Sequence, residues 1–273
     1  MRDTPRRPIA RRSRCDVQTI VSAAAPSLAG GGTLLVERAL PAPPLERVAA
    51  LPGRRVREVT VLHPALAARY TALVSAVALR VDGELSPSVA ANRVAVASVD
   101  PPRLVLRSFR GERVAFGRRA ARLARRTRCL LFADVRDCYR SIAPGVVGSS
   151  LRALGCEGSS VDAIVAFLRA LQERGVEGLP VGPDPSAVLA NAVLAEADRA
   201  LERLGAPHLR WVDDLVVGVD GSRGAARVLE VAREALDRVG LCLNDEKTRL
   251  VLAPASGALP RGISVARSAR EVG

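Results

Sequence analysis

Three aspartates lie where the sequence predicts that buried strands end. Asp134 follows the apolar run 129–133, and Asp213 and Asp214 lie between two apolar arms of a predicted hairpin. Moving an unpaired carboxylate out of water costs several kcal/mol, and adjacent carboxylates oppose each other's ionisation. A divalent cation reverses both penalties, because it favours ionised oxygen ligands. These residues therefore predict a metal site.

A shared site of three carboxylates suits two-metal phosphoryl transfer. If the strand of Asp134 neighbours the hairpin, one ion would activate an attacking 3′-hydroxyl and the other would neutralise the leaving pyrophosphate. Because the available ligands are hard oxygens, we expect two Mg²⁺ ions, with Mn²⁺ as a substitute. The alternative is that Asp213 and Asp214 only cap the turn of the hairpin.

Apolar patterns around these aspartates predict a small antiparallel sheet backed by helices, an α/β (α+β) fold. Residues 129–135 form an expected strand, and 208–222 an expected β-hairpin with the acidic pair at its tip. Ser186 is expected to cap a long helix at 187–204. The other expected elements are helices at 146–154, 160–172 and 223–239, strands at 241–243 and 248–252, and a turn at 244–247. The long helix and the helix at 223–239 should cover one face of the sheet.

The preceding part of the chain is expected to form a strand at 56–62, a helix at 64–85 and a strand at 104–109. An arginine-rich helix should follow, with Arg118, Arg119, Arg122, Arg125 and Arg126. Spacings of three and four residues place several of these arginines on one side of the helix. That side is either a solvated surface or a phosphate-binding face.

The composition permits a large core and favours an anionic partner. Of 273 residues, 48% are hydrophobic, and 41 basic residues against 28 acidic ones give a net charge of +13. A general arginine bias is the alternative explanation, because Lys247 is the single lysine. The five cysteines are odd in number and widely spaced, which argues against disulfides and structural zinc. No apolar run approaches the roughly 20 residues that span a bilayer, so we expect a soluble, cytoplasmic protein with no membrane partner.

Four motifs, in this order, resemble those of reverse transcriptases. ADVRDCYRSI (133–142) resembles the first carboxylate motif, and WVDD (211–214) resembles the YADD box. GLPVGPDPSAVLAN (178–191) is similar to the loop and helix between them, and LNDEKTRL (243–250) to the lysine-bearing motif that follows. Val181, where many relatives have glutamine, makes the loop look closer to the retron and abortive-infection, defence-associated bacterial enzymes.

The resemblance implies a right-hand polymerase palm with partial fingers. The expected divisions are a basic, loosely ordered arm (1–45), a fingers-like region (46–128), the palm (129–255) and a short C-terminal tail (256–273). The tail is too short for a thumb, so a companion RNA or protein would have to supply the grip on the primer and template.

The resemblance also assigns roles to the acidic residues and the lysine. Asp134 and Asp213 would be the principal metal ligands, with Asp214 as an auxiliary carboxylate. Lys247 would act as a general acid toward pyrophosphate, a role that arginine cannot fill because it does not release its proton. A surface lysine kept by chance is the alternative.

Nucleotide-binding residues are implied in the same way. The turn at Asp137 would meet the triphosphate, and Tyr139 would lie under the sugar and exclude a ribose 2′-hydroxyl. Gly182 would let the backbone approach the nucleotide, and Ser186 and Asn191 would add polar contacts. The structural alternatives are turn capping for Asp137 and packing for Tyr139. For Ser186 and Asn191 they are capping and solvation of the helix face. Arg55, Arg57, Arg69 and Arg93 are further candidates for holding the triphosphate.

The expected function is an RNA-directed DNA polymerase that extends a DNA strand from dNTPs on an RNA or DNA template and primer, in the setting of phage defence. The alternative is a catalytically decayed palm module that binds nucleic acid or a partner protein. Intact carboxylates and Lys247 favour the first, whereas the missing thumb favours the second.

Overall fold

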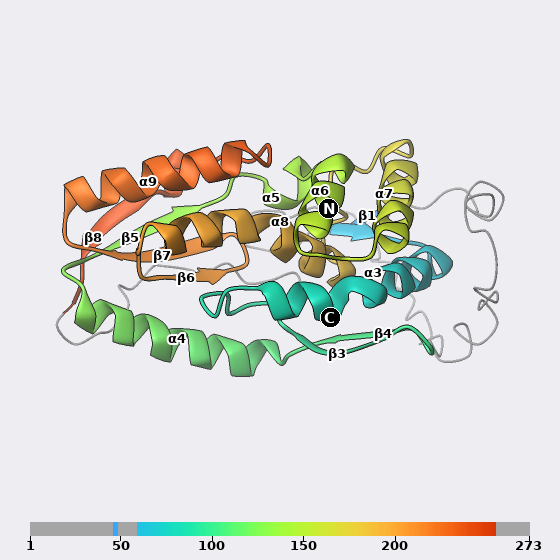
Figure 1. Cartoon of the computed structure of the whole chain (residues 1–273), viewed down its shortest axis with the longest axis horizontal. Coiled ribbons are helices and arrows are strands. Elements are labelled where there is room, and N and C mark those ends of the chain that lie inside the picture. Colours follow the sequence, from blue (N-terminus) through green and yellow to red (C-terminus); the bar gives the residue numbers. More distant parts are fainter. Residues whose placement is uncertain (1–45, 49–58, 255–273) are drawn as a thin grey trace, which may run out of the picture.

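The computed structural model describes residues 46–48 and 59–254 (Figure 1). The expected arm at 1–45, the tail at 256–273 and the candidate arginines Arg55 and Arg57 lie outside the described residues. The division of the chain at residues 128 and 255 stays a prediction.

A four-stranded antiparallel sheet forms one half of the molecule. Its strands are β5 (Cys129–Asp134), β6 (His208–Trp211), β7 (Asp214–Val219) and β8 (Arg249–Leu252), in the order β6-β7-β5-β8. The central strands pair from Cys129 opposite Val219 to Asp134 opposite Asp214. The expected β-hairpin and its proximity to the strand of Asp134 are therefore confirmed.

Helices cover both faces of this sheet, which explains why β5 is buried along its whole length. Side chains alternate between the two faces of a strand. On one face, Leu131 and Leu215 join the core formed with α8 (Asp184–Arg203) and α9 (Ser222–Asp237). On the other face, Phe132 and Val216 pack with α4 (Phe109–Arg126). Figure 1 shows α9 and α4 on opposite sides of the sheet.

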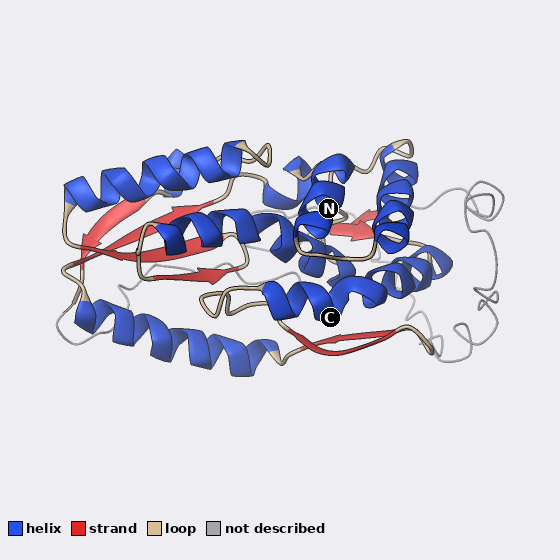
Figure 2. Ribbon diagram, viewed as in Figure 1, coloured by secondary structure: helices blue, strands red, loops and turns tan. Residues whose placement is uncertain are grey.

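The other half of the molecule is mostly helical and packs around α8 (Figure 2). It contains the long α3 (Pro64–Glu84), α6 (Pro144–Ala153) and α7 (Gly158–Gln172). Small elements complete the fold: β1 (Glu46–Val48) paired with β2 (Val59–Val61), β3 (Val94–Ser98) paired with β4 (Arg103–Leu106), α5 (Cys138–Ser141) and the 3-10 turn η1 (Asp245–Lys247). Helix α3 contributes to the same core as α8, so the two halves are continuous.

Three expected elements differ from the structure. The expected strand at 241–243 is wrong, because only Leu243 forms an isolated bridge, with Val135. The expected strand at 104–109 ends at Leu106, since Ser108 caps α4 by accepting a hydrogen bond from Gly111 N. The expected cap at Ser186 is also wrong: α8 begins at Asp184, and proline is tolerated in its first turn because the missing N–H has no helical acceptor there.

Among the described residues, no helix combines the length and apolar character that crossing a membrane requires.

Candidate active site

The sheet brings the two acidic segments together at one end. Asp134 and Asp214 are direct partners across β5 and β7. One residue further on, Val135 N donates a hydrogen bond to Asp213 O at 3.2 Å. Asp134 is only 4% exposed, whereas Asp213 and Asp214 are partly buried. Aspartates separated by about 80 residues in sequence therefore become neighbours, as the metal-site prediction requires.

The turn that carries Asp213 has an unusual backbone. Val212 has φ 58°, a left-handed conformation that is strained for a β-branched residue. Such strain costs about 1–3 kcal/mol and persists only where the surroundings enforce it. Arg210 provides part of that enforcement, because its Nη1 donates to Val212 O at 2.8 Å.

A buried polar network lies behind this turn. Arg210 is 1% exposed and donates through Nε and Nη2 to the Asp198 carboxylate, the shortest bond being 2.7 Å. Burial opposes the ionisation of Asp198, yet the charge of Arg210, its hydrogen bonds and the nearby His208 ring hold the pKa of Asp198 below the ordinary value. Arg210 Nη1 also donates to Asn191 Oδ1 at 2.9 Å. Helix α8 thus supports the turn that carries Asp213 through Asp198, Asn191 and Arg210.

Sequence reasoning missed this network. The available signal was a charged residue, Arg210, at an inward position of an apolar strand, together with Asp198 on an apolar face of the long helix. A buried charge requires a partner, but the pairing of these two residues depends on the packing of β6 against α8.

Lys247 lies at the carboxylate site. Its Nζ is 2.9 and 3.0 Å from the two carboxylate oxygens of Asp134. The backbone holds η1 in place, since Asn244 N donates to Asp134 O at 2.7 Å. The side chain of Lys247 is 52% exposed, so its ammonium group can reach both Asp134 and solvent.

Asp137 and Tyr139 follow β5 at the edge of the site. Asp137 is exposed, has φ 43° and precedes α5 without capping it through its side chain. Tyr139 is partly buried against the core, and burial followed by the neighbouring Cys138 raises the pKa of its phenol. Burial, followed by the charge of Asp213, raises the pKa of the Cys138 thiol.

The loop before α8 is bound tightly to α5. Leu179 N donates to Tyr139 O at 2.7 Å, and Arg140 Nε donates to Glu177 Oε2 at 3.0 Å. Gly178 has φ 62°, and an added Cβ would lie 2.4 Å from the carbonyl oxygens of Tyr139 and Arg140. Only glycine fits this close backbone approach.

Gly182 lies against the upstream strand. It has φ 119°, and an added Cβ would lie 2.7 Å from Val59 Cγ1. Thr60 N donates to Val181 O at 2.8 Å, which joins β2 to the loop. Gly182 therefore permits a close contact between β2 and the loop before α8.

Ser186 and Asn191 use their polar atoms inside the protein. Ser186 is fully buried, and its Oγ is 3.0 Å from the Tyr70 hydroxyl. Asn191 Nδ2 donates to Ala91 O at 3.1 Å, while its Oδ1 accepts from Arg210. Arg93 is similarly engaged, since its Nε donates to Asp82 Oδ1 at 2.7 Å. Asn191 thus contacts Arg210, which supports the acidic turn, whereas Ser186 and Arg93 are bonded to residues of α3.

The carboxylates suit a hard cation, although they do not form a closed cage. In the described part of the chain, no group of three or more His, Cys, Asp and Glu side chains is arranged to hold a metal ion. Asp134 nevertheless accommodates the cationic Nζ of Lys247 on both oxygens. With Asp214 opposite it and Asp213 one step away, hard oxygen donors gather at one edge.

Comparison with known proteins identifies the class of this fold and site. The family model described as reverse transcriptase (RNA-dependent DNA polymerase) matches residues 70–270, well over half of the chain. The chain belongs to the reverse transcriptase family. Members of this family generally use divalent metal ions.

A particular relative is also similar. The retron Mx65 reverse transcriptase of Myxococcus xanthus is 34% identical over 141 residues. The match covers 45% of this chain and 33% of that protein. The chain therefore spans about a third of the length of the curated relative.

Proposed function

We propose that this protein is an RNA-directed DNA polymerase that extends a DNA strand from dNTPs by two-metal nucleotidyl transfer. One observation carries the proposal: Asp134 and Asp214 face each other at the end of the sheet, with Asp213 joined to Val135 and Lys247 bound to Asp134. Family membership gives this arrangement its chemical meaning.

Asp134 and Asp213 would hold two Mg²⁺ ions, replaceable by Mn²⁺, with Asp214 as the auxiliary carboxylate. When bound, the ions activate the attacking 3′-hydroxyl and neutralise the charge on the leaving pyrophosphate. The buried bond from Arg210 to Val212 O orients the turn that carries Asp213.

Lys247 would donate the Nζ proton to the departing pyrophosphate. Its half-exposed side chain reaches from Asp134 toward solvent, where the pyrophosphate leaves. The turn at Asp137 would meet the triphosphate, and the ring of Tyr139 would exclude a ribose 2′-hydroxyl. Gly182 lies in the loop that packs against β2, next to α5 and the acidic turn.

The proposed partners are an RNA or DNA template with its primer, and a companion RNA or protein that completes the grip on them. The name of the Myxococcus relative supports a retron-type role. A role in phage defence is the further part of the proposal, and it rests on the resemblance of the loop at 178–191. A cytoplasmic location fits this role.

The second candidate is a catalytically decayed palm that binds nucleic acid or a partner protein. The net charge of +13 favours this candidate, because it suits a partner made of phosphates and does not require catalysis.

Primer extension separates the two candidates. The purified chain is given RNA or DNA templates, dNTPs and Mg²⁺ or Mn²⁺, with reactions that lack template beside them. Asp213→Asn should slow incorporation by a factor on the order of 10² or more, because the residue acts on the transition state. Asp220→Asn is the matched control, since Asp220 is exposed directly after β7, at the far end of that strand.

The polymerase proposal is supported if wild type and Asp220→Asn incorporate nucleotides and Asp213→Asn does not. Incorporation that persists in Asp213→Asn removes the proposed mechanism. A wild-type protein that binds nucleic acid without extending any primer supports the decayed module.

A further inference from the structure

Helix α4 exposes a face that is rich in arginine and poor in acid. Its sequence, FRGERVAFGRRAARLARR, contains seven arginines and one acidic residue, Glu112. Five of the arginines are exposed, and we name them the α4 arginine face: Arg110, Arg118, Arg122, Arg125 and Arg126. The face looks to solvent because Phe116, Ala120 and Ala124 bury the opposite side of the helix.

The charges on this face form a regular row. Arg118, Arg122 and Arg126 are four residues apart, so each step advances about 6 Å along the helix axis. A regular row of guanidinium groups suits a regular row of phosphates, because each guanidinium can donate two parallel hydrogen bonds to one phosphate.

This row does not serve the stability of the helix. Like charges four residues apart destabilise a helix. Burial lowers the pKa of Arg119, and repulsion from Arg122 and Arg93 lowers it further. Arg125 and Arg126 lie in the last turn, where cations favour the helix dipole. Arg118 and Arg122 lie before that turn and lack this benefit.

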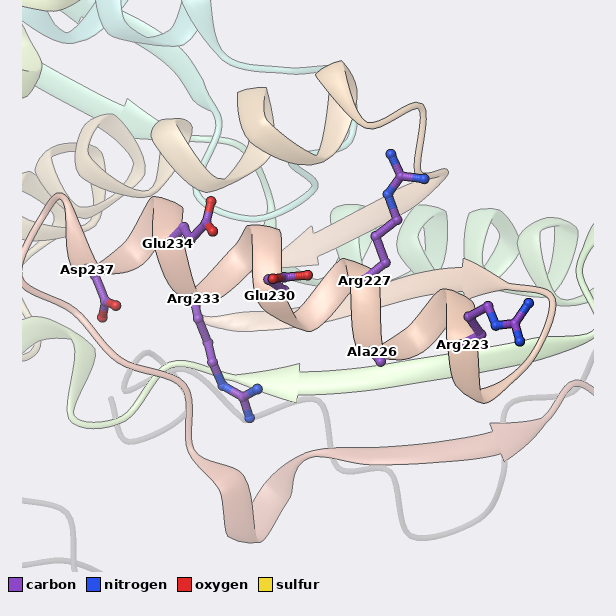
Figure 3. A pocket seen from close by; sticks show the side chains of 7 residues that line it. All are labelled: Arg223, Ala226, Arg227, Glu230, Arg233, Glu234 and Asp237. Atoms are coloured by element: carbon purple, nitrogen blue, oxygen red, sulfur yellow. The ribbon is translucent and has the colours of Figure 1, made fainter.

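Helix α9 shows that the arginine bias of the chain does not by itself produce such a face. A pocket on α9 is lined by three arginines and three acidic residues (Figure 3): Arg223, Arg227, Arg233, Glu230, Glu234 and Asp237. One of them, Arg233, is also paired with Asp245 at 2.9 Å. Positive charge is balanced on α9 and unbalanced on α4.

The α4 arginine face leads away from the candidate active site. At the start of the helix, the Phe109 ring is 5.3 Å from the ring of Trp211, which lies beside the acidic turn. At its end, Arg126 precedes Cys129, the end of β5 farthest from Asp134. A strand bound along this face would therefore extend beyond the site where nucleotides are added.

We propose that the α4 arginine face binds the phosphate backbone of an RNA segment outside the catalytic site. The choice of RNA rests on the proposed function, since this family is described as RNA-dependent. Binding of this kind releases counterions and therefore weakens as salt rises.

The test compares two double variants of the full chain that carry the same charge change. Arg118→Gln with Arg122→Gln alters the α4 arginine face, and Arg223→Gln with Arg227→Gln alters α9 at the same four-residue spacing. Fluorescence anisotropy measures the affinity for a labelled RNA hairpin over a series of salt concentrations. Circular dichroism confirms that both variants are folded.

The α4 variant should bind about tenfold more weakly at low salt, and its slope of log affinity against log salt should fall by about 2, one per lost phosphate contact. The α9 variant should match wild type in both respects. Equal losses in both variants, or unchanged binding by the α4 variant, overturns the proposal. A hairpin of DNA that responds as strongly as RNA overturns the assignment to RNA.

The polymerase proposal is tested separately in the same proteins. On a short primer and template at saturating concentration, the α4 variant should extend the primer at the wild-type rate, whereas Asp213→Asn should bind the RNA hairpin normally without extension. If wild type did not extend the primer, the polymerase proposal would fail. The proposal for α4 would still be decided, because the RNA affinities of the two double variants are measured independently of extension.

Discussion

Lys247 is the single lysine of the protein. Its ammonium group lies within hydrogen-bond distance of the Asp134 carboxylate. Arginine could replace its charge and could reach the same carboxylate. It could not replace a proton donor, because the guanidinium group stays protonated under all ordinary conditions. Ion pairing and proton donation at this position can therefore be separated by substitution.

Lys247→Arg should slow primer extension about 10²-fold, the lower end of the range for general acid catalysis. The melting temperature should change by no more than about 4 °C, because arginine keeps a positive charge beside Asp134 and the substitution should cost at most about 1 kcal/mol. Extension rates and thermal melts measure the two effects. Lys247→Gln is the companion variant: if it is slow while Lys247→Arg equals wild type, Lys247 supplies charge and is not the proton donor.

At the scale of single residues, the sequence indicated the candidate residues of the site, but it did not indicate the buried residues that hold them in place. Asp134 could be singled out because a carboxylate that ends an apolar strand requires compensation, and the structure gives it Lys247 and Asp214 as neighbours. Arg210 and Asp198 could not be paired, because their contact depends on how β6 packs against α8. Ser186 was misassigned as a cap for a similar reason: its partner, Tyr70, lies more than 100 residues away.

The first turn of α4 carries the acidic residue of that helix, Glu112, in a partly buried position. Burial, opposed mainly by the charge of Arg107, raises the pKa of Glu112 from 4.5 to about 7. An acid whose pKa is raised by folding is destabilising when ionised. This cost is absent below the unfolded pKa near 4.5, grows between that value and about 7, and is complete above 7.

Glu112→Gln should therefore stabilise the protein at pH 8 and leave it unchanged near pH 4. The gain should be on the order of 1 kcal/mol, because the position is open to solvent and the full shift must be discounted. Urea unfolding at pH 4, 6 and 8 gives the measurement. A variant that is less stable than wild type at pH 8 would show that the ionised carboxylate is favourable, with Arg107 outweighing burial.

Elements with strong apolar periodicity were predicted closely, whereas those fixed by their neighbours were not. The expected helix at 64–85 is α3, and the hairpin at 208–222 is β6 and β7. Strand β3 alternates valine with alanine and was not foreseen, because its pairing with β4 compensates for the weak strand propensity of alanine. The segment at 241–243 has strand-like residues, yet the sheet offers it only one bridge, from Val135.

Helix α8 connects the two halves of the molecule. Fifteen of its 20 residues are buried, and it packs against α3 and α6 in the helical half and α9 over the sheet. Through Asp198 and Asn191 it also holds Arg210, which supports the acidic turn. Because one element belongs to both halves, we expect them to unfold together.

Two optical signals report on the two parts of the structure. Trp211 is the single tryptophan of the chain and is fully buried between the sheet and α4, so its fluorescence reports on that layer. Far-ultraviolet circular dichroism reports mainly on the helices.

Leu189 on α8 is fully buried, so Leu189→Ala should destabilise the protein by about 2–5 kcal/mol through lost burial and a cavity.

If α8 couples the halves, Leu189→Ala should lower the unfolding midpoint of both signals by the same amount, on the order of 10 °C. Leu79→Ala is the matched control, because Leu79 is 57% exposed on α3 and should change stability by no more than about 0.5 kcal/mol. Coincident midpoints are the mark of a cooperative transition. A shift of the circular dichroism midpoint with unchanged Trp211 fluorescence would mean that the sheet and α4 fold independently of α8, and the acidic turn would then need a support other than this helix.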